Sequence, residues 1–281
     1  MSNERRYLES CYLASENLTK KFSTSFSLGI FCLDKRIRKY VYAIYGLVRV
    51  GDEIVDTFFD VDQRSELDLF EAQAMDSIKN KYSSNMVLHA FQDVVNKFNI
   101  TENLIKSFFE SMRMDLTDRS HNEETYKKYI FGSAEVVGLM CLHIFTNGDK
   151  DDFNALEKPA KRLGSAFQKV NFLRDISEDY QDKGRSYFPN LDLNKKLNED
   201  DKKIIIKDIE DDFSAAYLGI KKLPKTCRFG VTMAYKYYLQ LLLKIKKTSP
   251  EKIISTRIRI SNFSKFLLLI STSLKSILKI N

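Results

Sequence analysis

Hydrophobic residues recur every three or four positions along most of this chain, which is the period of a helix with one buried face. Clustered polar residues interrupt the pattern at 147–152, 194–203 and 246–252. Asp34 and Thr101 stand at expected N-cap positions, and Gly184 suits the residue just past a helix end. The pattern predicts helices over 35–59, 64–80, 84–98, 102–117, 123–146, 151–182, 204–222, 227–247 and 262–279.

Composition favours the same fold class. The chain has 281 residues, of which 43% are hydrophobic, and contains only 10 Gly and 4 Pro. A chain of this length can bury a sizeable core, and the scarcity of helix-breaking residues favours helix. No Pro- or Ser-rich linker, internal repeat or low-complexity tract divides it. We therefore expect an all-α protein with a single domain over residues 1–281.

Cysteine and histidine usage gives no sign of a disulfide framework or a zinc site. Cys11, Cys32, Cys141 and Cys227 are far apart, and the three histidines have no partner at zinc-ligand spacing. The stretch 1–9 lacks the apolar core of a signal peptide. These features predict reduced thiols in a cytoplasmic protein.

The balance of charge points to an anionic partner. The formal net charge is +7 and the pI is near 9.0, which suits nucleic acid, a membrane surface or a phosphorylated substrate. The sequence contains no zinc-finger spacing, RNA-recognition motif, GxGxxG or GxxxxGK. We therefore expect no nucleic acid partner.

The C-terminal stretch 263–280 is apolar, but Lys265, Lys275 and Lys279 make it a poor transmembrane span. A closing core helix is the favoured interpretation. The alternative is a helix lying on a membrane surface, which would place the protein peripherally on the inner face of the cell membrane.

Two aspartates lie beside the apolar face of the first long predicted helix. Tyr45, Arg49, Asp52 and Asp56 follow one edge of that face at steps of four, three and four residues. A lone pair of this kind is common by chance and usually marks a solvated surface. The apolar face itself comprises Ile37, Val41, Ile44, Val48 and Val55.

A second predicted helix repeats the arrangement. Gln168, Asn171, Asp175 and Asp179 run at steps of three, four and four residues. This polar edge lies beside an apolar stripe of Leu163, Phe167 and Val170. If the two helices face each other, four carboxylates and an amide surround one cavity.

Four neighbouring carboxylates repel one another and need a compensating cation. Oxygen ligands of this kind suit Mg²⁺, with Mn²⁺ as an alternative, and protein-bound Mg²⁺ usually completes its shell with phosphate oxygens. A diphosphate is therefore the expected ligand, with Arg49, Arg174 and Arg185 nearby in sequence to hold it. The 20 Phe and 14 Tyr can supply apolar walls for a hydrophobic substrate or a carbocation.

Several sequence blocks carry a family resemblance. Ser23-Thr-Ser-Phe-Ser27 is followed by Tyr42-Ala-Ile-Tyr-Gly-Leu-Val-Arg49 and Asp52-Glu-Ile-Val-Asp56. Gln168-Lys-Val-Asn-Phe-Leu-Arg-Asp-Ile-Ser-Glu-Asp179 is followed by Gly184-Arg-Ser-Tyr-Phe-Pro189. These blocks resemble the serine motif, both aspartate-rich motifs and the RxYxP loop of the squalene and phytoene synthases. The resemblance covers most of the chain and implies the isoprenoid synthase fold, a helical bundle around a central apolar cavity.

Two further stretches resemble the carotenoid branch of that family. Met112-Arg-Met-Asp-Leu116 is similar to the MxxDL element of phytoene synthases, and Val137-Gly-Leu-Met140 to their VGLM. Phe131 and Glu135 stand where relatives often have Tyr and Gly. That departure leaves the preferred chain length and the cavity lining open.

The resemblance implies a two-step reaction in one cavity. Ionisation of one geranylgeranyl diphosphate would give an allylic cation, and the double bond of a second molecule would attack it to form a cyclopropyl (prephytoene) diphosphate. A second ionisation, rearrangement and proton loss would give phytoene. The catalytic residues would be Asp52, Asp56, Asp175 and Asp179, which with Asn171 would hold Mg²⁺.

The same resemblance implies a set of substrate-binding residues. For Tyr187 and Tyr237 a packing role is the alternative. The set comprises Ser23, Ser25, Tyr45, Arg49, Gln168, Asn171, Arg174, Arg185, Tyr187 and Tyr237.

Within the family, the alternative is squalene or dehydrosqualene synthesis from farnesyl diphosphate. Squalene synthases reduce the rearranged cation with NADPH and often have a membrane-spanning tail. The sequence shows no clear tail and no dinucleotide fingerprint, so NADPH is not expected. The basic surface and apolar C-terminus favour peripheral membrane contact, because the product must reach a membrane.

Three alternatives come from other classes. A non-catalytic assembly or scaffold relative is disfavoured by the four aspartates, Asn171 and Arg174. A head-to-tail chain-elongating prenyl transferase would carry DDxxD in both motifs, which this chain lacks. A generic nucleic acid binder would leave the acidic pairs unexplained.

Overall fold

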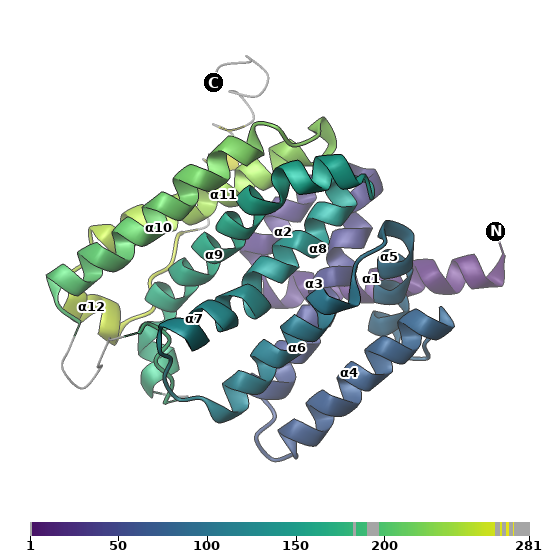
Figure 1. The fold of residues 1–281 in the computed structure, drawn as a ribbon, viewed down its shortest axis with the longest axis horizontal. Helices are drawn as coiled ribbons and strands as arrows, with labels where there is room; N and C mark the ends of the chain where they lie inside the picture. Colours follow the sequence, from purple (N-terminus) through teal and green to yellow (C-terminus); the bar gives the residue numbers. More distant parts are fainter. Residues whose placement is uncertain are drawn as a thin grey trace.

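The computed structural model describes residues 2–181, 184–189, 197–261, 265, 268, 269 and 272, and these form a bundle of helices (Figure 1). The described residues contain no β-strand, which confirms the predicted all-α class. The elements in chain order are α1 Asn3–Phe22, α2 Thr24–Phe31, α3 Lys35–Asp56, α4 Gln63–Asn80, α5 Met86–Phe98, α6 Glu102–Thr117, α7 Glu123–Ile130, the π-helix η1 Phe131–Glu135, α8 Val136–Phe145, α9 Lys150–Gln181, α10 Glu199–Ile220, α11 Lys225–Lys246 and α12 Pro250–Ser255.

Helix ends follow local capping chemistry. Asp34 is the N-cap of α3, where its side chain accepts a hydrogen bond from the backbone N–H of Arg36. Thr101 is the N-cap of α6 but makes no side-chain capping bond. Gly184 has a φ of 63°, a left-handed conformation that favours glycine. The predicted start of the 204–222 helix was wrong by five residues, because Asn198 caps α10 earlier, inside the polar break.

Three helices were not predicted. The N-terminal α1 has a polar composition, and its buried face includes Ser15 and Thr19, so few large apolar side chains mark its buried positions. Helix α2 is only eight residues long, and α12 only six. Short helices give too few turns for a periodic signal, and tertiary packing supplies their stability.

The predicted helix 123–146 is a continuous run of α7, η1 and α8. Its middle is a π-helix, and there Gly132 packs so closely on α6 that an added Cβ would lie 2.4 Å from Ser107 O. The run Glu123–Phe145 is long and apolar enough to cross a membrane by length and composition alone. Half of its most apolar window is buried within the protein, as for a core helix.

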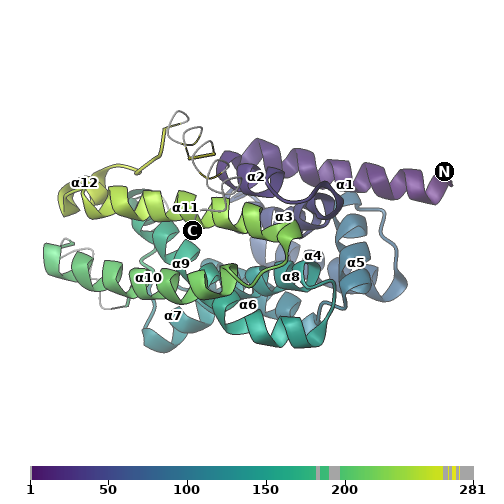
Figure 2. The same ribbon diagram turned by 90° about the horizontal axis from the view of Figure 1, so that it is seen from above.

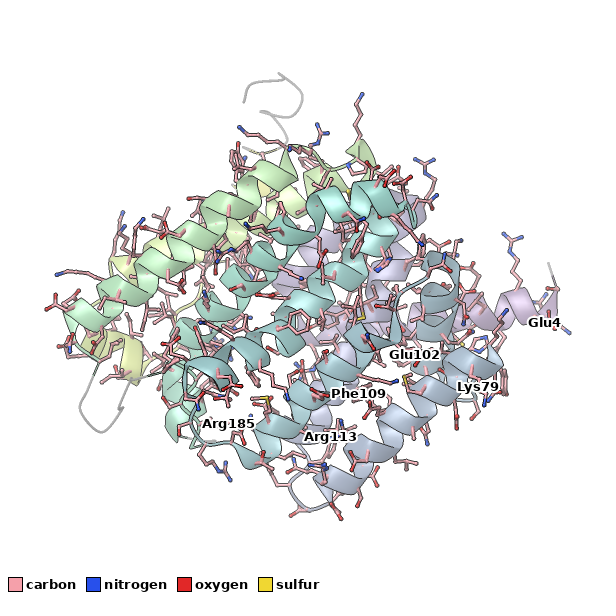
Figure 3. All side chains as sticks on the ribbon, viewed as in Figure 1. Glu4, Lys79, Glu102, Phe109, Arg113 and Arg185 are labelled. Carbon is pink, nitrogen blue, oxygen red and sulfur yellow. The ribbon has the colours of Figure 1, made fainter. Side chains whose placement is uncertain are left out.

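Two helices occupy the middle of the molecule. In Figure 2, α3 lies below α1 and α2 and above α6, and α9 lies below α11 and above α7. Packed aromatic and aliphatic side chains fill the interior; Phe109, labelled in Figure 3, and Phe108 are fully buried. This placement lets α3 and α9 present one face each to the interior of the bundle.

A buried ionic cluster joins α9 to α10. Asp212 of α10 is fully buried and accepts hydrogen bonds from Ser165 Oγ at 2.7 Å and Lys169 Nζ at 2.8 Å. Arg162 also pairs with Asp212. Because removing one partner would leave buried charge uncompensated, this cluster fixes the register of the two helices.

The predicted C-terminal helix 262–279 falls almost entirely outside the described residues. The choice between a core helix and a membrane-surface helix therefore stays a prediction.

Candidate active site

A cavity of about 1000 Å³ extends into the bundle. Its lining comes mainly from α2, α3, α8, α9 and α11, with the segment that follows α12. Along most of its wall the side chains are apolar or aromatic, such as Val48, Val137 and Leu163. Charged side chains gather where α3 and α9 approach their C-terminal ends.

Both acidic edges line this cavity. Asp52 and Asp56 reach it from the end of α3, and Asp175 and Asp179 from the end of α9. The helix faces beside them are buried, as the sequence predicted, with Val55 only 1% exposed. The structure thus brings together two acidic pairs that are far apart in sequence.

Arginines neutralise part of the acidic end. Arg185 Nη1 lies 2.7 Å from Asp56 Oδ1, and Arg174 Nε donates to Asp175 Oδ1 at 2.8 Å. Burial works against the charge of both guanidiniums, yet the neighbouring carboxylates raise the pKa of each above its usual value. Both arginines therefore remain charged. Arg185 lies behind the main cavity wall, next to Asp56 and Tyr187.

Arg257 is a further charged residue of the cavity that the sequence did not reveal. It lies in the irregular segment after α12, where Nε is 2.9 Å from Asp175 Oδ1 and Nη1 is 2.7 Å from Glu178 Oε2. Arg259 and Lys265 also line the cavity. No helical period or motif marked this segment, so only the tertiary structure could identify it.

Arg49 faces the cavity from α3. It forms an ion pair with Glu53, one turn further along the helix, and its guanidinium lies over the Phe22 ring at 4.6 Å from the centroid. Its Nε is buried and makes no hydrogen bond within the protein. The side chain therefore keeps a donor for an incoming anion.

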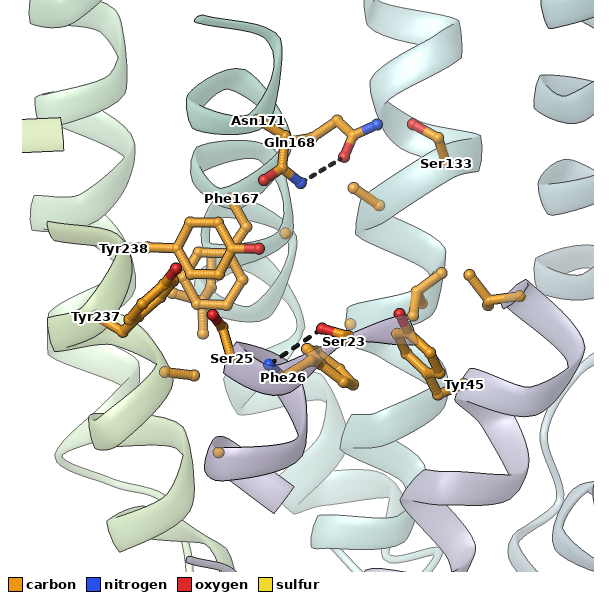
Figure 4. Close-up of a pocket in the computed structure, with 18 of the residues that line it drawn as sticks. Ser23, Ser25, Phe26, Tyr45, Ser133, Phe167, Gln168, Asn171, Tyr237 and Tyr238 are labelled. Atoms are coloured by element: carbon orange, nitrogen blue, oxygen red, sulfur yellow. Dashed lines mark hydrogen bonds between the residues drawn. The ribbon is translucent and has the colours of Figure 1, made fainter. Parts of the chain in front are cut away.

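The N-terminal serine block forms the start of α2. Ser23 is its N-cap and accepts a hydrogen bond from the backbone N–H of Phe26 at 3.2 Å (Figure 4). Ser25 and Tyr45 line the cavity nearby, and Tyr45 stacks on Phe26 with ring centroids 4.9 Å apart. Burial, together with the charge of Asp52, raises the pKa of the Tyr45 phenol, so it stays a neutral donor.

Two amides of α9 face the middle of the cavity. Asn171 Nδ2 donates to Gln168 Oε1 at 3.4 Å, as drawn in Figure 4, whereas Asn171 Oδ1 is buried without a hydrogen-bond partner. Across from them Ser133, on η1, has a buried hydroxyl that also lacks a partner. Ser133 was not predicted as a site residue, although it lies at a helical spacing of four residues from two other lining residues, Tyr129 and Val137.

Aromatic rings complete the wall near the amides. Tyr237 and Tyr238 lie on α11, and Tyr238 stacks on Phe167 of α9 with centroids 4.1 Å apart (Figure 4). Tyr237 contacts Tyr238 edge-on. All three rings line the cavity.

Tyr187 lies beside a buried carboxylate. Its hydroxyl donates to Asp115 Oδ1 at 2.9 Å, and Tyr129 donates to Asp115 Oδ2 at 2.8 Å. Burial raises the pKa of Asp115 to about 6, although the Arg185 charge opposes the rise. The Tyr187 hydrogen is therefore directed at Asp115, and its ring stacks on Phe172 at 4.2 Å.

The donor set fits a hydrated divalent cation. Among the described residues, no group of three His, Cys, Asp or Glu side chains is placed to hold one ion without rearrangement. Nevertheless the cavity collects the four aspartates of the two acidic edges and one buried amide oxygen, Asn171 Oδ1, that has no protein partner. Hard oxygen donors that leave room for water and phosphate oxygens suit Mg²⁺.

Comparison with known proteins identifies relatives of this chain. The model of the squalene/phytoene synthase family matches residues 19–264. The chain is 28% identical to 4,4'-diapophytoene synthase of Staphylococcus haemolyticus, over 67% of this chain and 65% of that protein. It is 27% identical to phytoene synthase 1 of Zea mays, over 88% of this chain and 64% of that protein. The matched part thus spans less than two thirds of the length of these relatives.

Solved structures share the architecture. A dehydrosqualene synthase crystallised with a ligand superposes with a TM-score of 0.81 at 25% identity, covering 98% of this chain and 99% of that one. The squalene synthase of Alicyclobacillus acidocaldarius gives a TM-score of 0.74 at 20% identity, covering 85% and 94%. The fold is therefore the isoprenoid synthase fold of the squalene synthase type.

Proposed function

The chain belongs to the squalene/phytoene synthase family, and from that premise we propose that it joins two geranylgeranyl diphosphates head to head to form phytoene. The family consists of head-to-head prenyl transferases that make phytoene, diapophytoene or squalene. The reaction would pass through a cyclopropyl diphosphate and release two diphosphates.

One observation carries the proposal: a single cavity combines a charged end with a long apolar wall. Asp52, Asp56, Asp175 and Asp179 lie at the charged end, and aromatic and aliphatic side chains line the remainder. Such a site suits a ligand with an anionic head and a hydrocarbon tail. A scaffold protein would have no use for carboxylates and arginines held at the mouth of an apolar chamber.

The arginines would hold and orient the diphosphates. Arg49 keeps a buried donor that has no protein partner, and Arg174 and Arg257 both contact Asp175. Guanidinium groups bind phosphate oxygens through directed, charge-assisted hydrogen bonds. Ser23, Ser25 and Tyr45 would add neutral donors beside the same end of the cavity.

The carboxylates would hold the cation that neutralises the diphosphates. Mg²⁺, or Mn²⁺ in its place, would be bound by Asp52, Asp56, Asn171, Asp175 and Asp179. When bound, the ion supplies electrophilic stabilisation of the departing diphosphate. Because four carboxylates at one site repel one another, metal binding also relieves an electrostatic cost of the fold.

The apolar wall would protect the carbocations. Phe167, Tyr237 and Tyr238 line the cavity, and aromatic rings stabilise positive charge that comes to lie over their faces. Burial of the chamber excludes water that would otherwise capture an allylic cation.

Synthesis of squalene or dehydrosqualene from farnesyl diphosphate is the second candidate. It is favoured by the similarity to diapophytoene synthase in sequence and to a dehydrosqualene synthase in structure. We propose the C20 substrate because the MxxDL and VGLM blocks resemble phytoene synthases. On that interpretation no NADPH is needed, since the rearranged cation loses a proton and is not reduced.

A membrane surface is proposed as the destination of the product. A C40 polyene is insoluble in water, and the net charge of +7 suits an anionic lipid surface. We therefore propose peripheral contact with the inner face of the cell membrane and a cytoplasmic active site.

The deciding experiment supplies purified protein and Mg²⁺ with geranylgeranyl or farnesyl diphosphate, each with and without NADPH. Hydrocarbon extracts are then separated and identified by mass. A C40 product from geranylgeranyl diphosphate without NADPH supports the proposal, and a C30 product moves the protein to the second candidate. If folded protein makes no hydrocarbon from either substrate, the non-catalytic interpretation is the correct one.

A further inference from the structure

Asp115 is a buried carboxylate for which the proposed reaction has no use. It lies on α6, with a side chain only 6% exposed, at the wall of the cavity. Tyr129 and Tyr187 donate to its two different oxygens, at 2.8 and 2.9 Å. Held from both sides, the carboxylate cannot turn without losing a hydrogen bond.

Arg185 lies between this carboxylate and a predicted metal ligand. Its Nη1 is 2.7 Å from Asp56 Oδ1 and 3.5 Å from Asp115 Oδ1. The Arg185 side chain is 6% exposed, whereas that of Asp56 is 29% exposed. The guanidinium thus has one fixed, buried carboxylate and one that faces the cavity. Figure 3 shows Arg185 beside the C-terminal end of α6.

The backbone around Arg185 is also held in place. Its own N–H donates to Asp179 O at 2.9 Å, and the next N–H, that of Ser186, donates to Arg119 O at 2.8 Å. Arg185 Nη2 contacts Val55 O at 3.3 Å. The guanidinium therefore stays close to both carboxylates.

A buried guanidinium is stable only next to negative charge. If Asp56 turned towards a metal ion and Asp115 were absent, Arg185 would lose its close carboxylate partner. With Asp115 in place, the guanidinium keeps a counter-ion whether Asp56 faces it or a metal.

We propose that Asp115 is a positioning residue, the permanent counter-ion of Arg185, which allows Asp56 to leave that arginine and bind Mg²⁺. The inference rests on the proposed function, because it assigns Asp56 to the metal. Asp115 contacts neither metal nor substrate in this scheme; it acts through Arg185. Residues 56, 115 and 185 lie in three separate sequence blocks, and none of these blocks places the three side chains together.

The test is a thermal-unfolding titration of the full chain with Mg²⁺, alone and with inorganic diphosphate as the probe anion. In Asp115→Asn the Mg²⁺ concentration that gives half of the maximal shift should rise about tenfold, because metal binding to Asp56 then strips Arg185 of its remaining carboxylate. Turnover of the same variant should recover at high Mg²⁺. A purely structural role would lower the unfolding midpoint and leave the Mg²⁺ dependence unchanged.

Two further variants serve as controls. Asp212→Asn removes another fully buried aspartate from an ionic cluster outside the cavity. It should lower the unfolding midpoint without moving the Mg²⁺ titration. The double variant Asp115→Asn/Arg185→Gln removes both charges, so its Mg²⁺ half-saturation should return to within about twofold of the wild type.

Each outcome decides the matter. A wild-type Mg²⁺ titration in Asp115→Asn overturns the inference. If that variant does not fold, Arg185→Gln is compared with the double variant; equal Mg²⁺ titrations support the inference, and unequal ones overturn it, since Asp115 should act only through Arg185. The Mg²⁺ titration needs no prenyl substrate. Absence of hydrocarbon product in the turnover assay would therefore refute the proposed function without deciding this inference. Absence of any Mg²⁺-dependent shift in the wild type would remove the metal site and this inference together.

Discussion

Arg257 Nε lies 2.9 Å from Asp175 Oδ1, although 82 positions separate the two residues in sequence. The contact joins the segment after α12 to the last turns of α9. It adds a positive charge to an acidic end that already contains Arg185, which pairs with Asp56. The charged end of the cavity is thus closed by arginines from two distant segments.

Replacing Arg257 should weaken substrate binding more than turnover. We expect Arg257→Gln to raise the KM for the prenyl diphosphate about tenfold or more, because a charge-assisted hydrogen bond contributes about 1.5–3 kcal/mol. Steady-state kinetics measures the change. Arg64→Gln is the matched control, since Arg64 is exposed and pairs with Asp68 outside the cavity. An unchanged KM in Arg257→Gln would show that Arg257 only pairs with the carboxylates of α9 and does not bind substrate.

Neutralising an aspartate of either pair should abolish turnover but not folding. We expect Asp52→Asn and Asp175→Asn each to lower kcat roughly a thousandfold, since metal stabilisation of a leaving group is worth several kcal/mol. Without metal, the unfolding midpoint of Asp52→Asn should stay or rise, because repulsion within the acidic end falls, whereas that of Asp175→Asn should fall, because Arg174 and Arg257 lose a carboxylate partner. Asp200→Asn, at an exposed position on α10, is the control. Near-normal product formation by both variants would refute the metal assignment.

Glu135 should give the protein a pH-dependent stability. Burial raises the pKa of its carboxyl from 4.5 to about 7, although the charge of Lys161 opposes the rise. The folded state therefore binds the proton more tightly than the unfolded state, so this contribution to stability is complete below pH 4.5 and is lost as the pH rises through 7. Glu135→Gln should remove this pH-dependent loss. The unfolding midpoint of the variant minus that of the wild type should therefore be larger at about pH 8 than at about pH 5.

Circular dichroism melts of both proteins at several pH values measure this difference. Other groups titrate in the same range, so the quantity of interest is the difference between variant and wild type. A constant difference from about pH 5 to about pH 8 would mean that Glu135 keeps an ordinary pKa.

Gly132 should be intolerant of a methyl group. An added Cβ would lie 2.4 Å from Ser107 O and 2.7 Å from Ser111 Cβ, so η1 would have to move away from α6. We expect Gly132→Ala to cost about 1–3 kcal/mol in the free energy of unfolding, as overpacking of a core does. Denaturant unfolding measures it. Gly184→Ala tests the contrast, since Gly184 has no neighbour within 4 Å and owes any cost to its positive φ. Wild-type stability of the Gly132→Ala protein would mean that η1 can shift freely.

Much of the fold could be predicted because the buried positions of a long helix recur with a regular period in the local sequence. A helix such as α3 repeats its buried face over 22 residues, and every turn adds to the same signal. The buried face of α1 includes small polar residues, and α2 and α12 are too short to repeat a pattern, so local periodicity did not reveal these helices. The π-turn at Phe131–Glu135 depends on close contact with α6, which no local pattern records.

The sequence by itself determined which residues could carry the chemistry. The steps of three and four residues set Asp52 and Asp56 on one helix edge and Asn171, Asp175 and Asp179 on another, because helix geometry depends only on neighbours along the chain. The sequence blocks that contain these residues also pointed to the squalene/phytoene synthase family, whose model matches residues 19–264.

Only the tertiary structure decided what surrounds those residues. It brought Arg257 to Asp175 and set Arg185 between two carboxylates. Such contacts join segments dozens of residues apart, and they form because each helix must bury its apolar face against a particular partner. Electrostatic environment follows from those packings, which is why the Met112–Leu116 block marked Asp115 but could not predict its burial or its raised pKa.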